Sequence, residues 1–351
     1  MPDTVRPRFG YCLPIFANPT AGLFRTPNYD RVDARTTLDL GIHAEEVGFD
    51  SLWVADHLML GRDEAILEGW TILSALAATT RTARLGMIHQ AHYFRAPALA
   101  AKMAATLDQL SGGRLIMFYD FGRQAREHHA YHLPYPDDVD IRVRETVDGI
   151  TLIRDLWARG SGSTPLTATC GAYGVTDATC TPVPAQAEVP IWFGEMEEGL
   201  LDACAAFGHG WNTTPCGLDE LGRRLDLLRA ACDRAGRDIS EIEISVEMQV
   251  LVAESDEAVR STLRGLLAKA SSETPDRERI DLALQAFANG EAEAPPASFI
   301  ERTLIGTPEQ VRAQLQAYVD TGTDHFLLWF LDAPDRAGMD LAAREVFPAF
   351  A

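Results

Sequence analysis

The stretch HAEEVGFDSLWVADHL, residues 43–58, contains the structural unit that decides the fold of this chain. A helical pattern over residues 30–47 is closed by Gly48, and a short apolar run, SLWVADH at residues 51–57, follows. A glycine just after the last helical residue ends a helix, and an apolar run of this length is typical of a buried strand. The strand ends in two polar residues, Asp56 and His57. The stretch therefore predicts a helix followed by a strand with reactive groups at its end.

Seven further stretches have the same short apolar character. They are RFGYCLPIF (8–16), ARLGMIHQ (83–90), RLIMFYDF (114–121), VPIWFGE (189–195), HGWNTTP (209–215), EISVEMQVLVA (243–253) and HFLLWFL (325–331). Helical patterns lie between them, among them residues 97–110, which open with a proline, and residues 307–318, where Thr307 and Gln310 can form a capping box. Eight strands alternating with helices favour an α/β fold of the (β/α)8 TIM barrel type over an open doubly wound sheet. No G-x-G-x-x-G follows a strand, which weakens the dinucleotide-binding alternative.

Two segments interrupt this alternation. Residues 160–187, after strand four, are rich in Gly, Ser, Thr and Pro and are typical of an inserted loop with a small hairpin. Residues 271–296, after strand seven, are polar at both ends around a short helical centre. We expect one barrel domain over residues 1–351 with these two insertions, each of which is either a lid over the site or a surface excursion.

Composition narrows the class of protein. The 31 Lys and Arg residues against 51 Asp and Glu residues give a formal charge of −20, which repels phosphate backbones and anionic membranes. We therefore expect neither nucleic acid nor a membrane as a partner. The first residues lack the pattern of a secretory signal, and no apolar run of about 20 residues occurs, so we expect a cytoplasmic protein. Six dispersed cysteines without a C-x-x-C pair favour reduced thiols, with a Cys170–Cys180 pair across a hairpin as the alternative.

Polar residues at the carboxyl ends of the strands are the candidate reactive groups, because active sites of such barrels lie there. They are Asp56 and His57 after strand two, His89, Gln90 and His92 after strand three, Tyr119, Asp120 and Arg123 after strand four, Glu195 after strand five, and residues 212–214 on strand six. An Asp beside a His can orient the imidazole for proton transfer near neutral pH. We predict that Asp56 and His57 are catalytic; the alternative is that Asp56 caps a turn and His57 only packs.

Three histidines lie close together in REHHAYHLPY, residues 126–135. His128 and His132 have the i, i+4 spacing by which two ligands on a helix face one metal ion, but the H-E-x-x-H order is absent. Glu127 is the one carboxylate nearby that could serve as a ligand, and we expect no metal site. We predict instead that His128 and His132 line the substrate entrance; the alternative is that these histidines lie in solvent. Trp70, Tyr93 and Tyr119 are predicted to add aromatic walls to the substrate pocket, although aromatic residues in such positions are often core. The chain has no G-x-S-x-G motif and no P-loop, so neither serine hydrolysis nor phosphoryl transfer has support.

Several blocks in the same order resemble the bacterial luciferase-like superfamily of flavin-dependent monooxygenases and deazaflavin (F420)-dependent oxidoreductases. They are HAEEVGFDSLWVADHL (43–58), LSALAATTRTARLG (73–86), PALAAKMAATLDQLSGGRL (97–115), CTPVPAQAEVPIWFG (180–194) and LIGTPEQVRAQLQAYVDTGTDHFLLWFLD (304–332). The resemblance implies a barrel that forms homodimers or larger homo-oligomers, with a flavin or deazaflavin across its mouth. In the monooxygenase branch it implies FMN reduced by a separate flavin reductase, dioxygen and a small organic substrate. F420-dependent hydride transfer is the alternative, and a non-catalytic ligand-binding barrel is the third possibility.

Carried onto this sequence, the resemblance implies that His57 is the group that transfers a proton or contacts the flavin. The predicted cofactor neighbours are His89, Gln90, Asp120, Arg123, Glu195, Met196 and Thr213. Two segments depart from the family pattern. After SGGRL many relatives continue with a glycine-rich segment followed by an acid, whereas this chain has IMFYDFGRQAREHH, residues 116–129, in which the bulky Phe118, Tyr119 and Phe121 replace small residues. Where relatives continue after PIWFG with small residues that hold the cofactor phosphate, this chain has EMEEGL, residues 195–200. Carboxylates near a phosphate cost about 1 kcal/mol or more unless they turn away, so we expect either Arg123 to compensate or the acids to cap the following helix.

Overall fold

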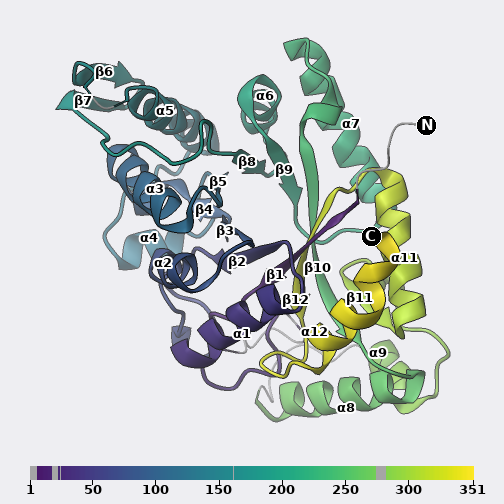
Figure 1. Cartoon of the computed structure of the whole chain (residues 1–351). Coiled ribbons are helices and arrows are strands. Elements are labelled where there is room, and N and C mark those ends of the chain that lie inside the picture. Colours follow the sequence, from purple (N-terminus) through teal and green to yellow (C-terminus); the bar gives the residue numbers. More distant parts are fainter. Residues whose placement is uncertain (1–5, 18–22, 24, 161, 274–281) are drawn as a thin grey trace.

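A computed structural model describes residues 6–17, 23, 25–160, 162–273 and 282–351 (Figure 1). Eight parallel strands form a closed barrel in the order β1, β2, β3, β5, β8, β9, β10, β12, because β12 pairs with β1 and β10 pairs with both β9 and β12. Their bounds are β1 Arg8–Cys12, β2 Ser51–Ala55, β3 Arg84–Ile88, β5 Leu115–Asp120, β8 Ile191–Gly194, β9 Gly210–Thr213, β10 Glu243–Val252 and β12 His325–Phe330. The predicted TIM barrel is confirmed, and every predicted strand is present, with earlier ends than most of the sequence patterns indicated.

Two parallel strands lie outside the predicted set. The short β4, Gln90–Ala91, pairs with the end of β5. The strand β11, Thr303–Gly306, pairs with the second half of β10 from Gln249 to Val252, whereas β9 pairs with the first half from Glu243 to Val246. The ten-residue β10 is thus long enough to have two successive neighbours on one side. The predicted pattern placed no strand at Thr303–Gly306, which directly precedes the capping box of the next helix.

Helices surround the barrel (Figure 1). Their bounds are α1 Ala34–Glu46, α2 Gly69–Thr79, α3 Pro97–Ser111, α4 Ala125–Ala130, α5 Val139–Trp157, α6 Glu198–Phe207, α7 Leu218–Ala235, α8 Asp256–Glu273, α9 Leu282–Asn289, α10 Ala297–Ile300, α11 Pro308–Thr321 and α12 Ala337–Leu341. The capping box of Thr307 and Gln310 is present at the start of α11. Gly112 closes α3 with a left-handed backbone, φ 72°, which glycine adopts without a steric penalty. None of the described helices is long and apolar enough to cross a membrane.

The insertion at residues 160–187 contains an antiparallel hairpin of β6, Leu166–Cys170, and β7, Tyr173–Ala178. The hairpin lies beside α5 at the outer edge of the molecule (Figure 1). It is tied to the barrel by Tyr173, whose hydroxyl lies 2.7 Å from His92 Nε2. Of the second insertion, residues 274–281 lie outside the described residues, and α8 and α9 flank them. All six cysteines are free thiols.

The barrel interior contains a column of polar side chains from β10. Glu243, Ser245, Glu247 and Gln249 alternate along the strand and are therefore on one face. At the amino end of the barrel Glu243 accepts from Arg8 and Arg84 and contacts His325, and one layer higher Ser245 Oγ accepts from Asn212 at 2.8 Å. Glu247 belongs to the layer at the mouth. A polar column of this kind is possible in a closed barrel because facing strands supply a partner for each buried group.

Candidate active site at the barrel mouth

A cavity of about 150 Å³ opens at the carboxyl ends of the strands. It is lined by Arg25, Asp56, His57, His89, Ala91, Phe94, Asp120, Gly122, Arg123, Gln124, His128, Glu195 and Thr214. Seven of these residues belong to the set predicted from sequence: Asp56, His57, His89, Asp120, Arg123, His128 and Glu195. The parallel strands bring them together from positions far apart in the chain.

The imidazole of His57 is held by a carboxylate that the sequence did not single out as its partner. His57 Nδ1 lies 2.7 Å from Glu127 Oε1, and the other carboxylate oxygen accepts from the backbone N–H groups of Leu58 at 2.5 Å and Met59 at 3.2 Å. Burial opposes ionisation of Glu127, but His57 and these amides lower the pKa of its carboxyl group. An ionised carboxylate can only accept a hydrogen bond, so Nδ1 carries a proton and donates it to Glu127. Nε2 is then the ring nitrogen that can exchange a proton with a ligand.

The expectation that Asp56 orients His57 is therefore wrong. Asp56 is buried and accepts two bonds from Arg95, at 2.8 and 3.1 Å, and one from the backbone N–H of Ala91 at 3.1 Å. Burial raises the pKa of Asp56, while the Arg95 guanidinium opposes that shift. These bonds join the loops after β2 and β3, so Asp56 holds the floor of the mouth in place.

His89 lies at the centre of the mouth. It has a left-handed backbone, φ 54°, and its Nε2 is 2.7 Å from Glu247 Oε1. Its Nδ1 lies 3.4 Å from Asp120 Oδ2 and 3.9 Å from Glu195 Oε1. Burial lowers the pKa of His89, but Glu247 and Asp120 outweigh it and raise the value to about 9.

Glu195 turns into the mouth and does not cap the following helix. Its backbone is left-handed, φ 80°, and its side chain, only 6% exposed, forms an ion pair with Arg123. Within the part of the chain that the structure describes, no side chain caps the start of α6, although Glu197 accepts from the N–H of Met196 just before it, at 3.2 Å. The first turn of α6 is thus open, and the acid nearest the strand faces the barrel.

The sequence analysis missed Glu127, Glu247 and Arg25. Arg25 pairs with Glu247 at 3.1 Å, and its guanidinium lies 4.8 Å from the centre of the Trp329 ring. Burial raises the pKa of Glu247, but Arg25 and His89 lower it to about 2. The alternation of Glu243, Ser245, Glu247 and Gln249 in an otherwise apolar strand was the signal that could have identified Glu247, because successive polar residues on one face of a buried strand need partners.

Other predicted site residues do not line the cavity. Successive side chains of a strand point to opposite faces, and Tyr119 and Thr213 each lie next to a residue that faces the barrel interior. Both side chains therefore point outward, where Thr213 binds Arg224 on α7. Tyr93 donates to Glu145 at 2.7 Å, and the Trp70 ring stacks near Arg95. Gln90 is buried in β4, and Met196 lies outside the lining.

His132 is exposed, two residues past the end of α4, so the helical spacing with His128 is not realised. His128 does line the cavity. It stacks near Phe94, at 4.6 Å between ring centres, and burial lowers its pKa.

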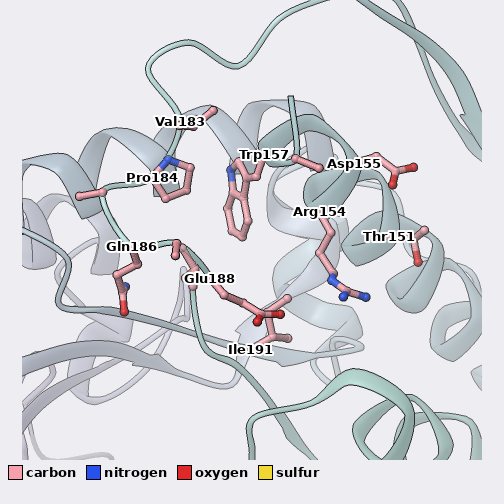
Figure 2. Close-up of a pocket in the computed structure, with 13 residues that line it drawn as sticks. Thr151, Arg154, Asp155, Trp157, Val183, Pro184, Gln186, Glu188 and Ile191 are labelled. Atoms are coloured by element: carbon pink, nitrogen blue, oxygen red, sulfur yellow. The ribbon is translucent and has the colours of Figure 1, made fainter. Parts of the chain in front are cut away.

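A second cavity lies outside the barrel. It has a volume of about 590 Å³ and is lined by residues of α5 and of the segment from Val183 to Ile191. Figure 2 shows the side chains of Trp157 and Arg154 of α5 on one side of it. Except for Ile191, no barrel-strand residue lines it, and the strand ends that carry His57 and His89 are elsewhere. We therefore assign the candidate active site to the barrel mouth.

Comparisons with known proteins agree with this geometry. A family model described as luciferase-like monooxygenase matches residues 8–325. The chain is 24% identical to an F420-dependent glucose-6-phosphate dehydrogenase of Amycolatopsis mediterranei, over 84% of this chain and 87% of that protein. It is 29% identical to the pyrimidine monooxygenase RutA of Cronobacter sakazakii, over 76% and 79%. The crystal structure of the long-chain alkane monooxygenase LadA superposes with a TM-score of 0.79 at 16% identity, covering 98% of this chain and 91% of that one, which shows a shared fold.

Proposed function

Since this chain belongs to the luciferase-like monooxygenase family, we propose that it uses reduced FMN and dioxygen to oxygenate a small organic substrate at the barrel mouth. The relatives named above are oxidoreductases, and they include both a monooxygenase and an F420-dependent dehydrogenase. The observation that carries the proposal is the His57–Glu127 pair at the cavity wall. It provides a proton donor and acceptor next to the space where a substrate binds.

Within this proposal, Glu127 keeps the His57 ring in one orientation and one tautomer. With Nδ1 committed to Glu127 at 2.7 Å, His57 holds or accepts its exchangeable proton at Nε2. The side chain of His57 is 22% exposed, so it reaches the cavity without being fully solvated. Phe94 and Ala91 exclude water from the adjacent wall. The reaction needs such shielding because water destroys reactive oxygen intermediates.

The described residues fit an FMN phosphate better than the sequence suggested. Glu195 faces the barrel, and no side chain of the described residues caps the ten-residue helix α6, so its first amide N–H groups can donate to an anion. Arg123 is half-exposed and has donors beyond the one that Glu195 uses, so it would hold the phosphate from the opposite side. A cavity of about 150 Å³ is smaller than the roughly 300 Å³ of a typical ligand pocket, so it takes the reacting end of the ligands. FMN, when bound, supplies the electrons for dioxygen.

The second candidate is F420-dependent hydride transfer, which the similarity to the glucose-6-phosphate dehydrogenase favours. The same His57 would then exchange a proton with the substrate oxygen. We further propose a homodimer in the cytoplasm that receives its reduced flavin from a separate reductase.

Anaerobic titration of the full chain with reduced FMN, and separately with F420, tests the proposal. We expect saturable FMN binding and a change in the rate at which dioxygen reoxidises the bound cofactor. F420 binding without FMN binding would move the assignment to the second candidate, and binding of neither would leave a ligand-binding barrel. The acid–base role is tested with Glu127→Gln, which we expect to reduce kcat by about 10- to 100-fold with little change in KM. His129→Gln, at an exposed position on the same helix, is the control.

A further inference from the structure

Three side chains from three neighbouring strand ends converge in the mouth: His89 after β3, Asp120 at the end of β5 and Glu195 after β8. One donor atom of each lies within 4.8 Å of the others. The distances from His89 Nδ1 are 3.4 Å to Asp120 and 3.9 Å to Glu195. All three residues line the cavity of about 150 Å³.

The second atom of each side chain is already held by the protein. His89 Nε2 is bonded to Glu247, Asp120 Oδ1 accepts from the N–H of Gly122 at 2.7 Å, and Glu195 Oε2 pairs with Arg123. Three donor atoms remain: Nδ1 of His89, one carboxylate oxygen of Asp120 and one carboxylate oxygen of Glu195. All three are directed at the same space. Metal ligands are commonly oriented in this way, with a carboxylate on the far nitrogen of the ligating histidine.

His89 Nδ1 is the atom whose surroundings are unexplained. It is buried and has no hydrogen-bond partner among the described residues. With a proton on each ring nitrogen, His89 is a cation that faces Asp120 and Glu195. When only Nε2 carries a proton and donates it to Glu247, Nδ1 presents a lone pair beside the two carboxylate oxygens, so a metal cation can replace the second imidazole proton at this position.

We propose that His89 Nδ1, Asp120 and Glu195 bind a divalent transition-metal cation of the Zn²⁺, Mn²⁺ or Co²⁺ class. Ligand atoms at about 2.0–2.2 Å from such an ion lie roughly 3–3.5 Å apart, so the His89–Asp120 separation of 3.4 Å already fits, and the wider separations, all within 4.8 Å, contract when the ion binds. One imidazole with two carboxylates suits these borderline ions better than Ca²⁺ or Cu⁺. Three protein ligands leave positions open toward the cavity, where water or another ligand can complete the coordination.

This site differs from the one considered in the sequence, because it uses neither His128 nor His132. It also does not depend on the proposed function: the metal ligands are distinct from His57 and Glu127, and metal binding can be measured without flavin. Failure of FMN to bind would leave the metal site standing, and the reverse also holds.

The test is a titration of the chelator-treated full chain with Co²⁺, whose visible absorption reports a nitrogen- and oxygen-liganded site, followed by displacement with Zn²⁺. We expect one ion per chain and a higher Tm with the metal present. Asp120→Asn and Glu195→Gln should weaken binding more than about 100-fold, and Glu247→Gln about 10- to 100-fold through the orientation of His89. Glu198→Gln, an exposed acid on the same turn as Glu195, is the matched control and should bind as the parent does.

His89→Asn guards against a variant that fails to fold, because asparagine tolerates the left-handed backbone at this position. It should keep the circular dichroism of the parent and lose the Co²⁺ absorption. Absence of a one-to-one Co²⁺ spectrum in the parent, or binding by Asp120→Asn and Glu195→Gln as tight as that of Glu198→Gln, would overturn the proposal. The cluster would then be an imidazolium ion-paired with two carboxylates.

Discussion

Replacement of Asp56 by asparagine separates a structural role from a catalytic one. The structure gives Asp56 three bonds inside the protein, two from Arg95 and one from the N–H of Ala91. Asparagine keeps one acceptor oxygen but directs its NH₂ group at the Arg95 guanidinium, so donors face donors. We expect Asp56→Asn to reduce the free energy of unfolding while the His57–Glu127 pair stays intact.

The magnitude follows from the bonds that remain. Removing one partner of a buried ion pair costs about 3–5 kcal/mol when the other charge is left alone. Arg95 is not left alone, because it also donates to Glu68 at 2.7 Å. One charge-assisted bond to Arg95, worth about 1.5–3 kcal/mol, is lost; the other is weakened because its acceptor becomes neutral, and the ion pair with Glu68 is kept. We therefore expect a loss of about 2–4 kcal/mol.

Urea unfolding followed by fluorescence measures this loss. The midpoint should fall while the slope with denaturant stays unchanged, and cofactor binding at a temperature where the variant is folded should match the parent. Glu68→Gln removes the more exposed partner of Arg95 and should cost less than about 1 kcal/mol. An Asp56→Asn protein that unfolds at the parent's midpoint yet loses turnover would refute the structural assignment and restore Asp56 as a catalytic residue.

Two further predictions concern packing and pH. A Cβ at Gly86 would lie 2.1 Å from the Trp53 ring, so Gly86→Ala should lower the free energy of unfolding in urea by about 3 kcal/mol. Gly222 on α7 has open space around it, so Gly222→Ala should raise that free energy by about 0.5–1 kcal/mol. Equal effects of the two substitutions would contradict the packing. Burial and neighbouring acids raise the pKa of Asp332 to about 6. Asp332 therefore binds a proton more tightly in the folded protein than in the unfolded chain, and the free energy of unfolding falls as pH rises from about 4 to 6. Asp332→Asn should remove this fall and be relatively more stable at pH 7 than at pH 4; a pH-independent difference would show that Asp332 is not responsible.

The mouth of this barrel combines two arrangements with different consequences. The His57–Glu127 pair lies on the wall and has one ring nitrogen free, which suits proton exchange with a ligand. The cluster around His89 lies deeper and is charged, with Glu247 and Arg25 beneath it. The cavity therefore has a histidine with a carboxylate partner on one side and the charged cluster of His89, Asp120 and Glu195 on the other.

Local sequence was sufficient for the barrel and for the mouth at which the candidate residues gather. Each strand is a short apolar run, each helix end is marked by residues such as Gly112 or Thr307, and these signals depend only on neighbours in the chain. Residues at the carboxyl ends of different strands could be predicted to lie close together because a parallel barrel places all of these ends at one mouth. That rule correctly brought together His57, His89, Asp120 and Glu195 from four separate segments.

Which side chains pair within the mouth was decided only by the tertiary structure. Asp56 is adjacent to His57 in sequence, yet it binds Arg95, while the partner of His57 is Glu127, 70 residues away. Glu195 lies at a helix start in the sequence, yet a left-handed backbone directs it to Arg123 and His89. A buried charge takes whichever partner the closed barrel brings within hydrogen-bonding distance, and that distance is set by strands far apart in the chain.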